Sequence, residues 1–327
     1  MKILILGSRD RYEKYSPGPL ADPAWDISFF PRGTGDAELL AGAGDAEIIL
    51  ADAIAPVSGG LIAGMPRLKM IHSEGVAYDK IDRAAAAERG IFVCNNKGCN
   101  AAAVAEQTVL LMLAWLRSLT AGDREVRAGR QIEMKERKMV EGITELGDCT
   151  VGLIGFGDIA RAAAQRLRAF GCKLYYYTPR RKSPEVEAEY GVDYADLYGL
   201  ADRADIVSVH AAVTPETTGL IDAAFLRRMK PGAFLVNTAR GEIVDNAALR
   251  EALIAGTIAG AAFDTLYPEP TPGDHPLVDL PASCRDRVVY APHLGGITTG
   301  SFRRAHRNMW ENAARIARGE RPVNIVS

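Results

Sequence analysis

Three polar residues in the last third of the chain, Arg240, Glu269 and His293, could together carry out acid–base chemistry on an anionic substrate. Each follows a short apolar segment with the composition of a buried strand. Residues that follow the strands of an open α/β sheet converge on one crevice, where ligands bind. A guanidinium, a carboxylate and an imidazole there predict an anion anchor and a proton donor with its partner. Singly, each has an ordinary explanation as a surface ion pair, a loop residue or a structural histidine.

The segment Val151–Ala160 contains a glycine pattern, G-x-G-x-x-A, that is typical of dinucleotide binding. It lies between an apolar segment and an amphipathic helix predicted over Asp158–Phe170. Gly155 would permit the tight turn, and Gly157 would let the backbone approach a pyrophosphate at the helix N-terminus. The alternative is a glycine turn that binds nothing. The strand before the motif and the helix after it favour a cofactor site.

The second strand of this predicted site ends in Thr178, which is followed by Arg180, Arg181 and Lys182. Sites for NAD carry an acidic residue here, ~20 residues past the glycines, which binds the ribose hydroxyls. A threonine in place of the acid, with guanidinium groups beside it, suits the 2′-phosphate of NADP. We therefore expect NADP as the favoured cofactor and NAD as the alternative. The competing interpretation is that these cations form a solvated loop.

Short apolar segments alternate with helical patterns along nearly the whole chain, which is the signature of parallel α/β architecture. Helices are expected over Asp82–Arg89 and from about Asn100 onward, and a long loop over Thr271–Asp286. Six strands in the second half suffice for one doubly wound domain, so we expect two such domains. The predicted strands are Lys2–Leu6, Ile27–Phe30, Glu47–Ala51, Leu68–His72, Ile91–Cys94, Thr150–Ile154, Lys173–Tyr177, Asp205–Val209, Ala233–Asn237, Ala259–Phe263 and Val288–Ala291.

The composition excludes several classes of protein. The chain has 327 residues, a net charge of -2 and no block of like charges, so nucleic acid and anionic membranes are not expected partners. Its five cysteines are scattered without a C-x-x-C pair, which favours reduced thiols in the cytoplasm over disulfides or a metal site. The N-terminus has the pattern of a buried strand, not of a signal peptide. The apolar stretch Ala101–Leu119 is interrupted by polar residues, which indicates a core helix.

Ordered motifs along the chain resemble those of the D-isomer-specific 2-hydroxyacid dehydrogenase family. The resemblance implies a flavodoxin-like substrate domain (residues 1–98 and 296–327) and an inserted Rossmann cofactor domain (residues 99–295). It also implies an active site in the interdomain cleft, a homodimer, and hydride transfer between NAD(P)H and a small 2-oxo acid such as glyoxylate or hydroxypyruvate. The motifs are Gly75–Asp79, Asn100–Glu106, Gly155–Ala160, Val209–Thr217, Met229–Gly232, Asn237–Gly241, Ala262–Pro270 and Pro292–Gly296.

The resemblance also assigns roles to matching residues. Arg240 would bind the substrate carboxylate, His293 would exchange a proton with the substrate oxygen, and Glu269 would orient the imidazole and favour its protonated form. The backbone N–H groups of Val76 and Ala77 would also bind the carboxylate. The expected cofactor-binding residues are Gly155, Gly157, Asp158, Ile159, Thr178, Arg180, Arg181, Ala211, Thr238, Ala239, Asp264 and Gly296, with Asp264 orienting the nicotinamide carboxamide.

Two further departures from the family pattern are Gln107, where a histidine is common, and Glu74, which precedes the substrate-binding loop. We assign Gln107 no catalytic role. An anion at Glu74 could repel dicarboxylates or pair with a cationic substrate group, although a solvated or salt-bridged carboxylate is the simpler interpretation. Two other functions stay open. The first is a nucleotide-sensing corepressor, which would be expected to carry extended tails, and the second is a formate or phosphite dehydrogenase.

Overall fold

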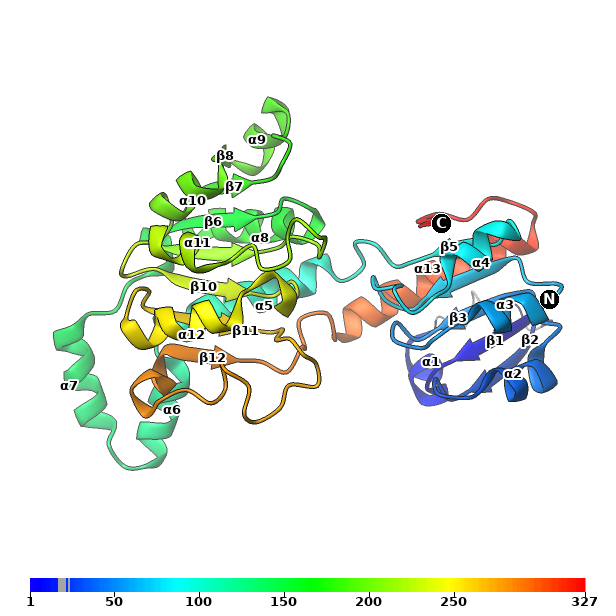
Figure 1. Cartoon of the computed structure of the whole chain (residues 1–327), viewed down its shortest axis with the longest axis horizontal. Helices are drawn as coiled ribbons and strands as arrows, with labels where there is room; N and C mark the ends of the chain where they lie inside the picture. Colours follow the sequence, from blue (N-terminus) through cyan, green and yellow to red (C-terminus); the bar gives the residue numbers. More distant parts are fainter. Residues whose placement is uncertain (17–21, 23, 327) are drawn as a thin grey trace. The chain divides into compact units, whose positions relative to one another are not determined.

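The computed structural model describes residues 1–16, 22 and 24–326. The chain divides into two compact units (Figure 1): unit 1 comprises Met1–Asn100 and Ile297–Ser327, and unit 2 comprises Ala101–Gly296. Each unit contains a parallel sheet with helices on both faces, which confirms the predicted α/β class.

Unit 1 is built on a five-stranded parallel sheet with the order β2-β1-β3-β4-β5. The connection reverses direction between β1 and β3, and the carboxyl ends of the strands at such a switch point are where ligands bind in flavodoxin-like sheets. The strands are β1 (Lys2–Leu6), β2 (Asp26–Phe30), β3 (Ile48–Ala51), β4 (Met70–Ser73) and β5 (Phe92–Cys94).

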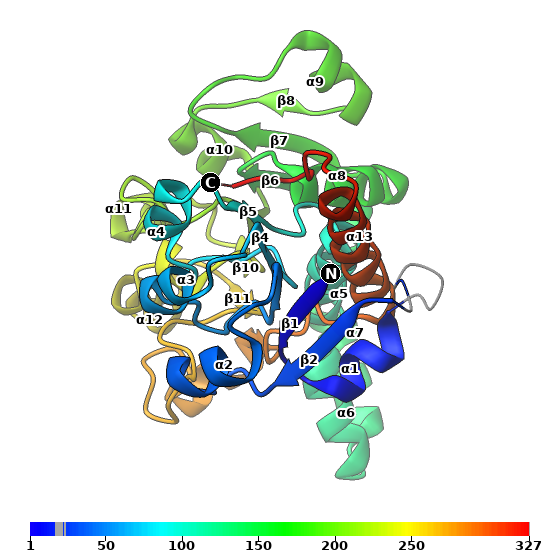
Figure 2. The same ribbon diagram turned by 90° about the vertical axis from the view of Figure 1, so that its right-hand side faces the viewer.

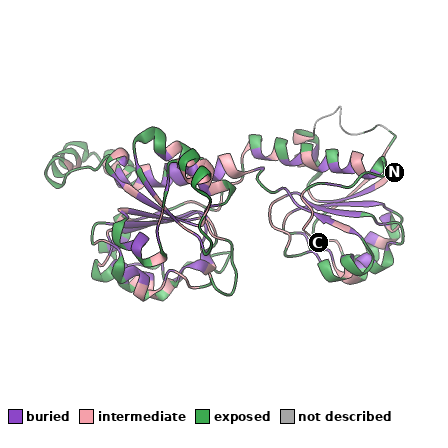
Figure 3. Cartoon of the chain, turned by 90° about the horizontal axis from the view of Figure 1, so that it is seen from above, coloured by how far each residue is buried: buried purple, intermediate pink, exposed green. Residues whose placement is uncertain are grey.

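Helices cover both faces of this sheet because successive side chains of each strand point in opposite directions. Leu4 and Leu6 pack toward α2, α3 and α4, whereas Ile3 and Ile5 pack with Trp310 of α13. Figure 2 shows these helices on the two sides of the sheet, and Figure 3 shows that the strands between them are buried. The helices are α1 (Arg9–Tyr15), α2 (Asp36–Ala43), α3 (Gly59–Gly64), α4 (Arg83–Glu88) and α13 (Thr299–Ala317).

Unit 2 is built on a seven-stranded parallel sheet with the order β12-β11-β10-β9-β6-β7-β8. The order reverses between β6 and β9, so the switch point lies at the strand that precedes the glycine motif. The strands are β6 (Thr150–Ile154), β7 (Lys173–Tyr177), β8 (Asp193–Tyr194), β9 (Ile206–Val209), β10 (Phe234–Asn237), β11 (Gly260–Phe263) and β12 (Val288–Tyr290).

One face of this sheet packs against α5 and α8, through residues such as Met112 and Leu167, and the other packs against α10, α11 and α12. The helices are α5 (Ala101–Leu116), α6 (Leu119–Arg127), α7 (Gln131–Glu141), α8 (Asp158–Phe170), α9 (Pro184–Tyr190), α10 (Leu197–Arg203), α11 (Ala223–Arg228) and α12 (Asn246–Ala255). Short 3-10 helices are η1 (Leu146–Asp148), η2 (Gly241–Ile243) and η3 (Ala282–Arg287).

The predicted strands agree with the observed ones to within one or two residues, and β8 is the strand that the sequence pattern did not predict. It has only two residues, too short to show an apolar pattern. The expected long loop over Thr271–Asp286 ends in η3, which begins at Ala282. Among the described residues, no single helix is long and apolar enough to cross a membrane. The bent pair α5 and α6 meets that test only by length and composition, and α5 is largely buried in unit 2.

Candidate active site

Glu269 and His293 form a hydrogen-bonded pair in unit 2. Both carboxylate oxygens of Glu269 lie near Nδ1 of His293, at 3.0 and 2.9 Å. They come together because His293 follows β12 and Glu269 follows β11, its neighbour in the sheet. The His293 side chain is 39% exposed. No partner of its Nε2 atom is recorded among the described residues, which leaves that nitrogen free to exchange a proton with a ligand.

The loop that carries His293 is held by Asp264. Its two carboxylate oxygens accept hydrogen bonds from the backbone N–H groups of Leu294 and Gly295, at 2.9 and 2.8 Å. His293 itself has a φ of 55°, a left-handed conformation that is uncommon for residues other than glycine. The amide of Gln107 also approaches Asp264, at 3.5 Å. Asp264, expected at the nicotinamide carboxamide, therefore also fixes the backbone of the His293 loop.

Arg240 lies close in space to the segment that leads to Glu269. A side chain on Gly241 would clash with the backbone of Leu266 and Tyr267, so the two turns pack directly on each other. The Arg240 side chain is exposed, and its one recorded hydrogen bond in the described structure goes to the backbone oxygen of Ala239, at 2.8 Å. No carboxylate pairs with it within the described ranges. The guanidinium is therefore available for an anion.

The glycine motif has the geometry that a dinucleotide requires. Gly155 has a φ of 91°, and a Cβ there would lie 2.8 Å from the backbone nitrogen of Ala211. Only glycine therefore fits this turn. Nothing lies within 4 Å of a Cβ built on Gly157, so the space above it is open. The first turn of α8, with Asp158 and Ile159, has no side-chain cap, and its N–H groups are free to bind phosphate oxygens.

The predicted ribose-site residues lie in the loop after β7, and each has a different environment. The hydroxyl of Thr178 donates to the backbone oxygen of Arg180, at 2.7 Å, so its hydrogen is already committed. Arg181 forms a two-point ion pair with Glu187, at 2.8 and 2.7 Å. The hydrogen bond from Arg181, followed by that from Tyr176, lowers the pKa of Glu187 to about 2. Arg180 is exposed and has no recorded side-chain partner in the described part of the chain.

Thr238 and Ala239 occupy the turn after β10, as expected for residues at a strand end. The hydroxyl of Thr238 lies 2.9 Å from that of Thr108 on α5, and the N–H of Ala239 donates to Asn237, at 3.0 Å. Gly296 is the last residue of unit 2 and is partly exposed. These contacts shape the edge of the sheet, and nothing in them conflicts with cofactor binding.

In unit 1, the loop after β4 presents two backbone N–H groups. The carbonyl oxygens of Val76 and Ala77 accept hydrogen bonds from Asn95 and Ser73, at 2.8 and 2.5 Å. Asn96 holds the start of the loop through the carbonyl oxygen of Glu74, at 2.9 Å. No acceptor is recorded for the N–H groups of Val76 and Ala77 within the described structure. A rigid loop with two free donors suits a carboxylate.

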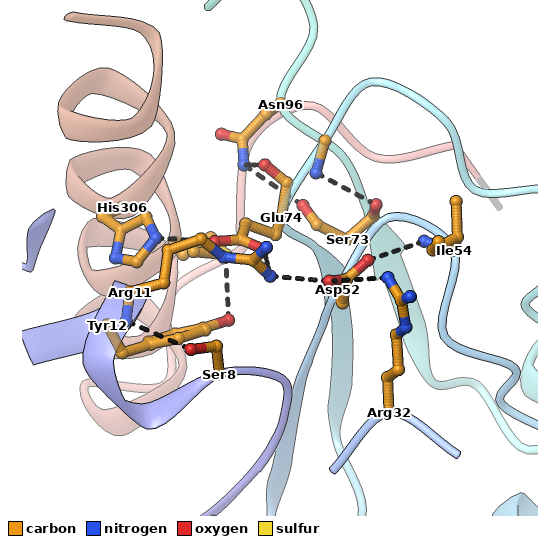
Figure 4. Close-up of polar contacts among 12 residues, drawn as sticks. Ser8, Arg11, Tyr12, Arg32, Asp52, Ile54, Ser73, Glu74, Asn96 and His306 are labelled. Atoms are coloured by element: carbon orange, nitrogen blue, oxygen red, sulfur yellow. Dashed lines mark hydrogen bonds and ion pairs between the residues drawn. The ribbon is translucent and has the colours of Figure 1, made fainter. Parts of the chain in front are cut away.

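Glu74 does not point freely toward a ligand. It is 5% exposed and accepts a hydrogen bond from Nε2 of His306, at 2.8 Å, and another from Arg11. Arg11 also donates to Asp52, at 2.6 Å (Figure 4). Burial disfavours the charge on Arg11, but Glu74 and Asp52 outweigh it and raise the pKa of Arg11. Of the interpretations open for Glu74, the salt-bridged carboxylate is the observed one.

Arg11 and His306 were not singled out from the sequence, and Asp52 was named only as part of the loop Asp52–Ile54 expected near the substrate side chain. Arg11 and Asp52 follow β1 and β3, so the rule that identified the strand-end residues of unit 2 would have found them. His306 is wholly buried on α13, more than 230 residues from Glu74 along the chain. No local sequence pattern reports such a contact.

Comparison with known proteins identifies what the chain resembles. The family model described as "D-isomer specific 2-hydroxyacid dehydrogenase, NAD binding domain" matches residues 109–295. The chain is 37% identical over 290 residues to a glyoxylate reductase from Thermofilum pendens, which covers 89% of this chain and 84% of that protein.

Solved structures of similar fold carry either nicotinamide cofactor. A D-lactate dehydrogenase from Lactobacillus jensenii with NAD+ aligns over 100% of both chains, with a TM-score of 0.85 and 27% identity. An acyclic imino acid reductase in complex with NADPH and D-Arg also aligns over 100% of both chains, with a TM-score of 0.82 and 25% identity.

Proposed function

The chain belongs to the D-isomer-specific 2-hydroxyacid dehydrogenase family, and we propose that it reduces small 2-oxo acids to D-2-hydroxy acids with NADPH. The observation that carries this proposal is the Glu269–His293 pair on the loop held by Asp264, with the turn that carries Arg240 packed on the segment before Glu269. Arg240 has no carboxylate partner among the described residues. A bound nicotinamide supplies the hydride, and the protein supplies the proton, the anion anchors and their orientation.

Each residue then has a distinct task. His293 donates a proton from Nε2 to the carbonyl oxygen, and Glu269 fixes the orientation of the ring through Nδ1. Arg240 binds the substrate carboxylate through its planar guanidinium. The free N–H groups of Val76 and Ala77 offer a second set of donors to a carboxylate. Glyoxylate and hydroxypyruvate are the substrates that we would test first.

The test is turnover of purified enzyme on glyoxylate, hydroxypyruvate and longer 2-oxo acids, each with NADPH and NADH, with formate and phosphite as alternative substrates. The variant His293→Ala should lower kcat by ~10²-fold or more, because general acid catalysis contributes about that factor. Its NADPH affinity, measured by fluorescence titration, should match that of the parent. Equal turnover by His293→Ala and the parent would remove His293 from the mechanism.

The proposed preference for NADPH is supported by the loop after β7, where Thr178 stands in place of an acidic residue and Arg180 has no side-chain partner among the described residues. We propose that Arg180 binds the 2′-phosphate and that Thr178 shapes the loop through the carbonyl oxygen of Arg180. Arg181 is held by Glu187 and contributes less. A charge-assisted hydrogen bond is worth about 1.5–3 kcal/mol, or roughly tenfold to a hundredfold in binding.

The matched pair Arg180→Ala and Arg181→Ala tests this assignment. Arg180→Ala should lower kcat/KM with NADPH about tenfold, because the side chain is exposed and its phosphate contact is partly screened. It should leave kcat/KM with NADH almost unchanged. Arg181→Ala should change the NADPH-to-NADH ratio much less. A parent enzyme that prefers NADH at low salt would refute the NADP assignment.

We also propose that the protein is a homodimer that associates through α7. Helix α7 has no buried residue, and the side chains of Ile132, Met139 and Val140 are 58%, 74% and 89% exposed. Apolar side chains clustered on one exposed helix indicate a protein interface. Sedimentation velocity should give a dimer for the parent and a monomer for Val140→Glu combined with Met139→Glu. The control Lys135→Glu, on the same helix, should stay dimeric.

A further inference from the structure

A cavity of about 520 Å³ opens at the carboxyl end of the sheet in unit 1. Its walls come from the segments that follow β1, β2 and β3, including Ser8, Arg9, Arg11, Phe30, Arg32 and Asp52. We call it the distal pocket. It lies at the switch point of the sheet, where ligands bind in folds of this type.

The distal pocket adjoins the loop with the two free N–H groups. Ala53 directly follows Asp52, and a Cβ built on Gly75 would lie 2.6 Å from the Cβ of Ala53. The turn after β3 and the turn after β4 therefore touch. The pocket wall at Asp52 and the loop that carries the two N–H groups are therefore neighbours at this edge of the sheet.

Asp52, which lines the pocket, and Glu74, which shares Arg11 with it, are already engaged in hydrogen bonds. One oxygen of Asp52 accepts from Arg11, at 2.6 Å, and the other accepts from the N–H of Ile54, at 3.1 Å. Both oxygens of Glu74 are engaged by Arg11 and His306. A cationic ligand would have to displace one of these buried contacts, which costs more than it gains.

The pocket's other arginines are open to a ligand. Arg32 approaches Asp52 only to 3.9 Å, and Arg9 approaches Glu13 only to 3.6 Å, both longer than a hydrogen bond. Their side chains are 58% and 59% exposed. Arg9 lies over the ring of Phe29, at 4.2 Å from its centroid, which limits its freedom.

We propose that the distal pocket binds a second acidic group on the substrate, a carboxylate or a phosphate at the far end of a 2-oxo acid, through Arg9 and Arg32. This inference rests on the proposed reduction of 2-oxo acids. Arg11 neutralises the negative charges of Asp52 and Glu74, so neither carboxylate repels the incoming anion. The expectation that an anion at Glu74 could repel dicarboxylates is thereby revised.

The test compares substrates that differ only at the far end. Two pairs are compared: 2-oxoglutarate with 2-oxopentanoate, and 3-phosphohydroxypyruvate with hydroxypyruvate. A fifth substrate, 5-guanidino-2-oxopentanoate, carries a cationic group at its far end. In the parent enzyme, kcat/KM should be about tenfold higher for the acidic member of at least one pair, mainly through a lower KM. The pair that shows the larger effect tells whether the pocket suits a carboxylate or a phosphate.

The variants Arg32→Gln and Arg9→Gln should each reduce that acidic-to-neutral ratio about threefold to tenfold, because each removes one partly exposed charge contact. Turnover of the neutral substrates should not change. The control Arg67→Gln removes another exposed arginine of unit 1, at the opposite end of β4, and should leave the ratio intact. The parent's KM for the acidic substrate should also rise with salt.

A parent enzyme that prefers the neutral or guanidino substrate would overturn the proposal for the distal pocket, even if neutral 2-oxo acids are reduced well. So would an acidic-to-neutral ratio that both arginine variants leave unchanged. An enzyme that reduces none of these acids with either cofactor would refute the proposed function and, with it, this inference. Circular dichroism spectra of the variants should match that of the parent, because the substituted side chains are exposed.

Discussion

Replacing Arg11 by leucine should destabilise unit 1 strongly. One guanidinium neutralises two carboxylates, on Asp52 and Glu74, which are 8% and 5% exposed. These residues follow β3 and β4, so Arg11 ties two strand ends together (Figure 4). Leucine retains much of the apolar stem but leaves two like charges in a poorly solvated site.

The size of the effect follows from burial. Removing one partner of a buried ion pair costs about 3–5 kcal/mol, because the remaining charge is left unpaired. The Arg11 side chain is 26% exposed, so some water reaches the site. We therefore expect a loss of about 3 kcal/mol in the free energy of unfolding of unit 1. Adding Glu74→Gln to Arg11→Leu removes one of the repelling charges and should recover about half of that loss.

The assay is equilibrium urea denaturation followed by tryptophan fluorescence. Trp25 and Trp310 lie in unit 1, with ring centroids 6.1 Å apart, whereas Trp115 lies in unit 2. A Trp115→Phe background therefore makes the signal specific for unit 1, which can be analysed as one cooperative transition. The control Arg9→Leu, at an exposed site nearby, should cost less than about 0.5 kcal/mol. A similar small loss for Arg11→Leu would refute the reasoning.

Two further predictions concern a catalytic and a buried titratable group. Glu269→Gln should lower kcat by about tenfold to a hundredfold with little change in NADPH affinity, because the amide no longer offers two carboxylate oxygens to Nδ1 and so orients the His293 ring less well. Stopped-flow turnover measures kcat, and fluorescence titration measures the affinity. Desolvation lowers the pKa of His72 from its ordinary value of 6.5 to about 4. The unfolded chain therefore binds the extra proton as the pH falls from about 6.5 to 4, and the free energy of unfolding of unit 1 should fall over that range. In His72→Gln the urea midpoint should depend less on pH, and an unchanged dependence would contradict the assignment.

The α/β class and most strands follow from the sequence, because a strand buried on both faces needs a continuous apolar run whatever its neighbours are. Lys2–Leu6, Thr150–Ile154 and Lys173–Tyr177 were predicted with the observed bounds. The glycine turn is equally local, since the left-handed φ of Gly155 is a property of the residue and its immediate chain. The position of His293 after a strand likewise follows from local pattern.

Only the tertiary structure decided which polar groups are engaged in hydrogen bonds or ion pairs and which can bind a ligand. Arg180 and Arg181 are neighbours of identical type, yet within the described structure Arg180 has no side-chain partner and Arg181 is held by Glu187 on α9. Glu74 could have faced a ligand, but His306 on α13 and Arg11 on α1 bind it in the interior. Such contacts join segments far apart in the chain, so their energy depends on packing and burial, which no local pattern of residues encodes.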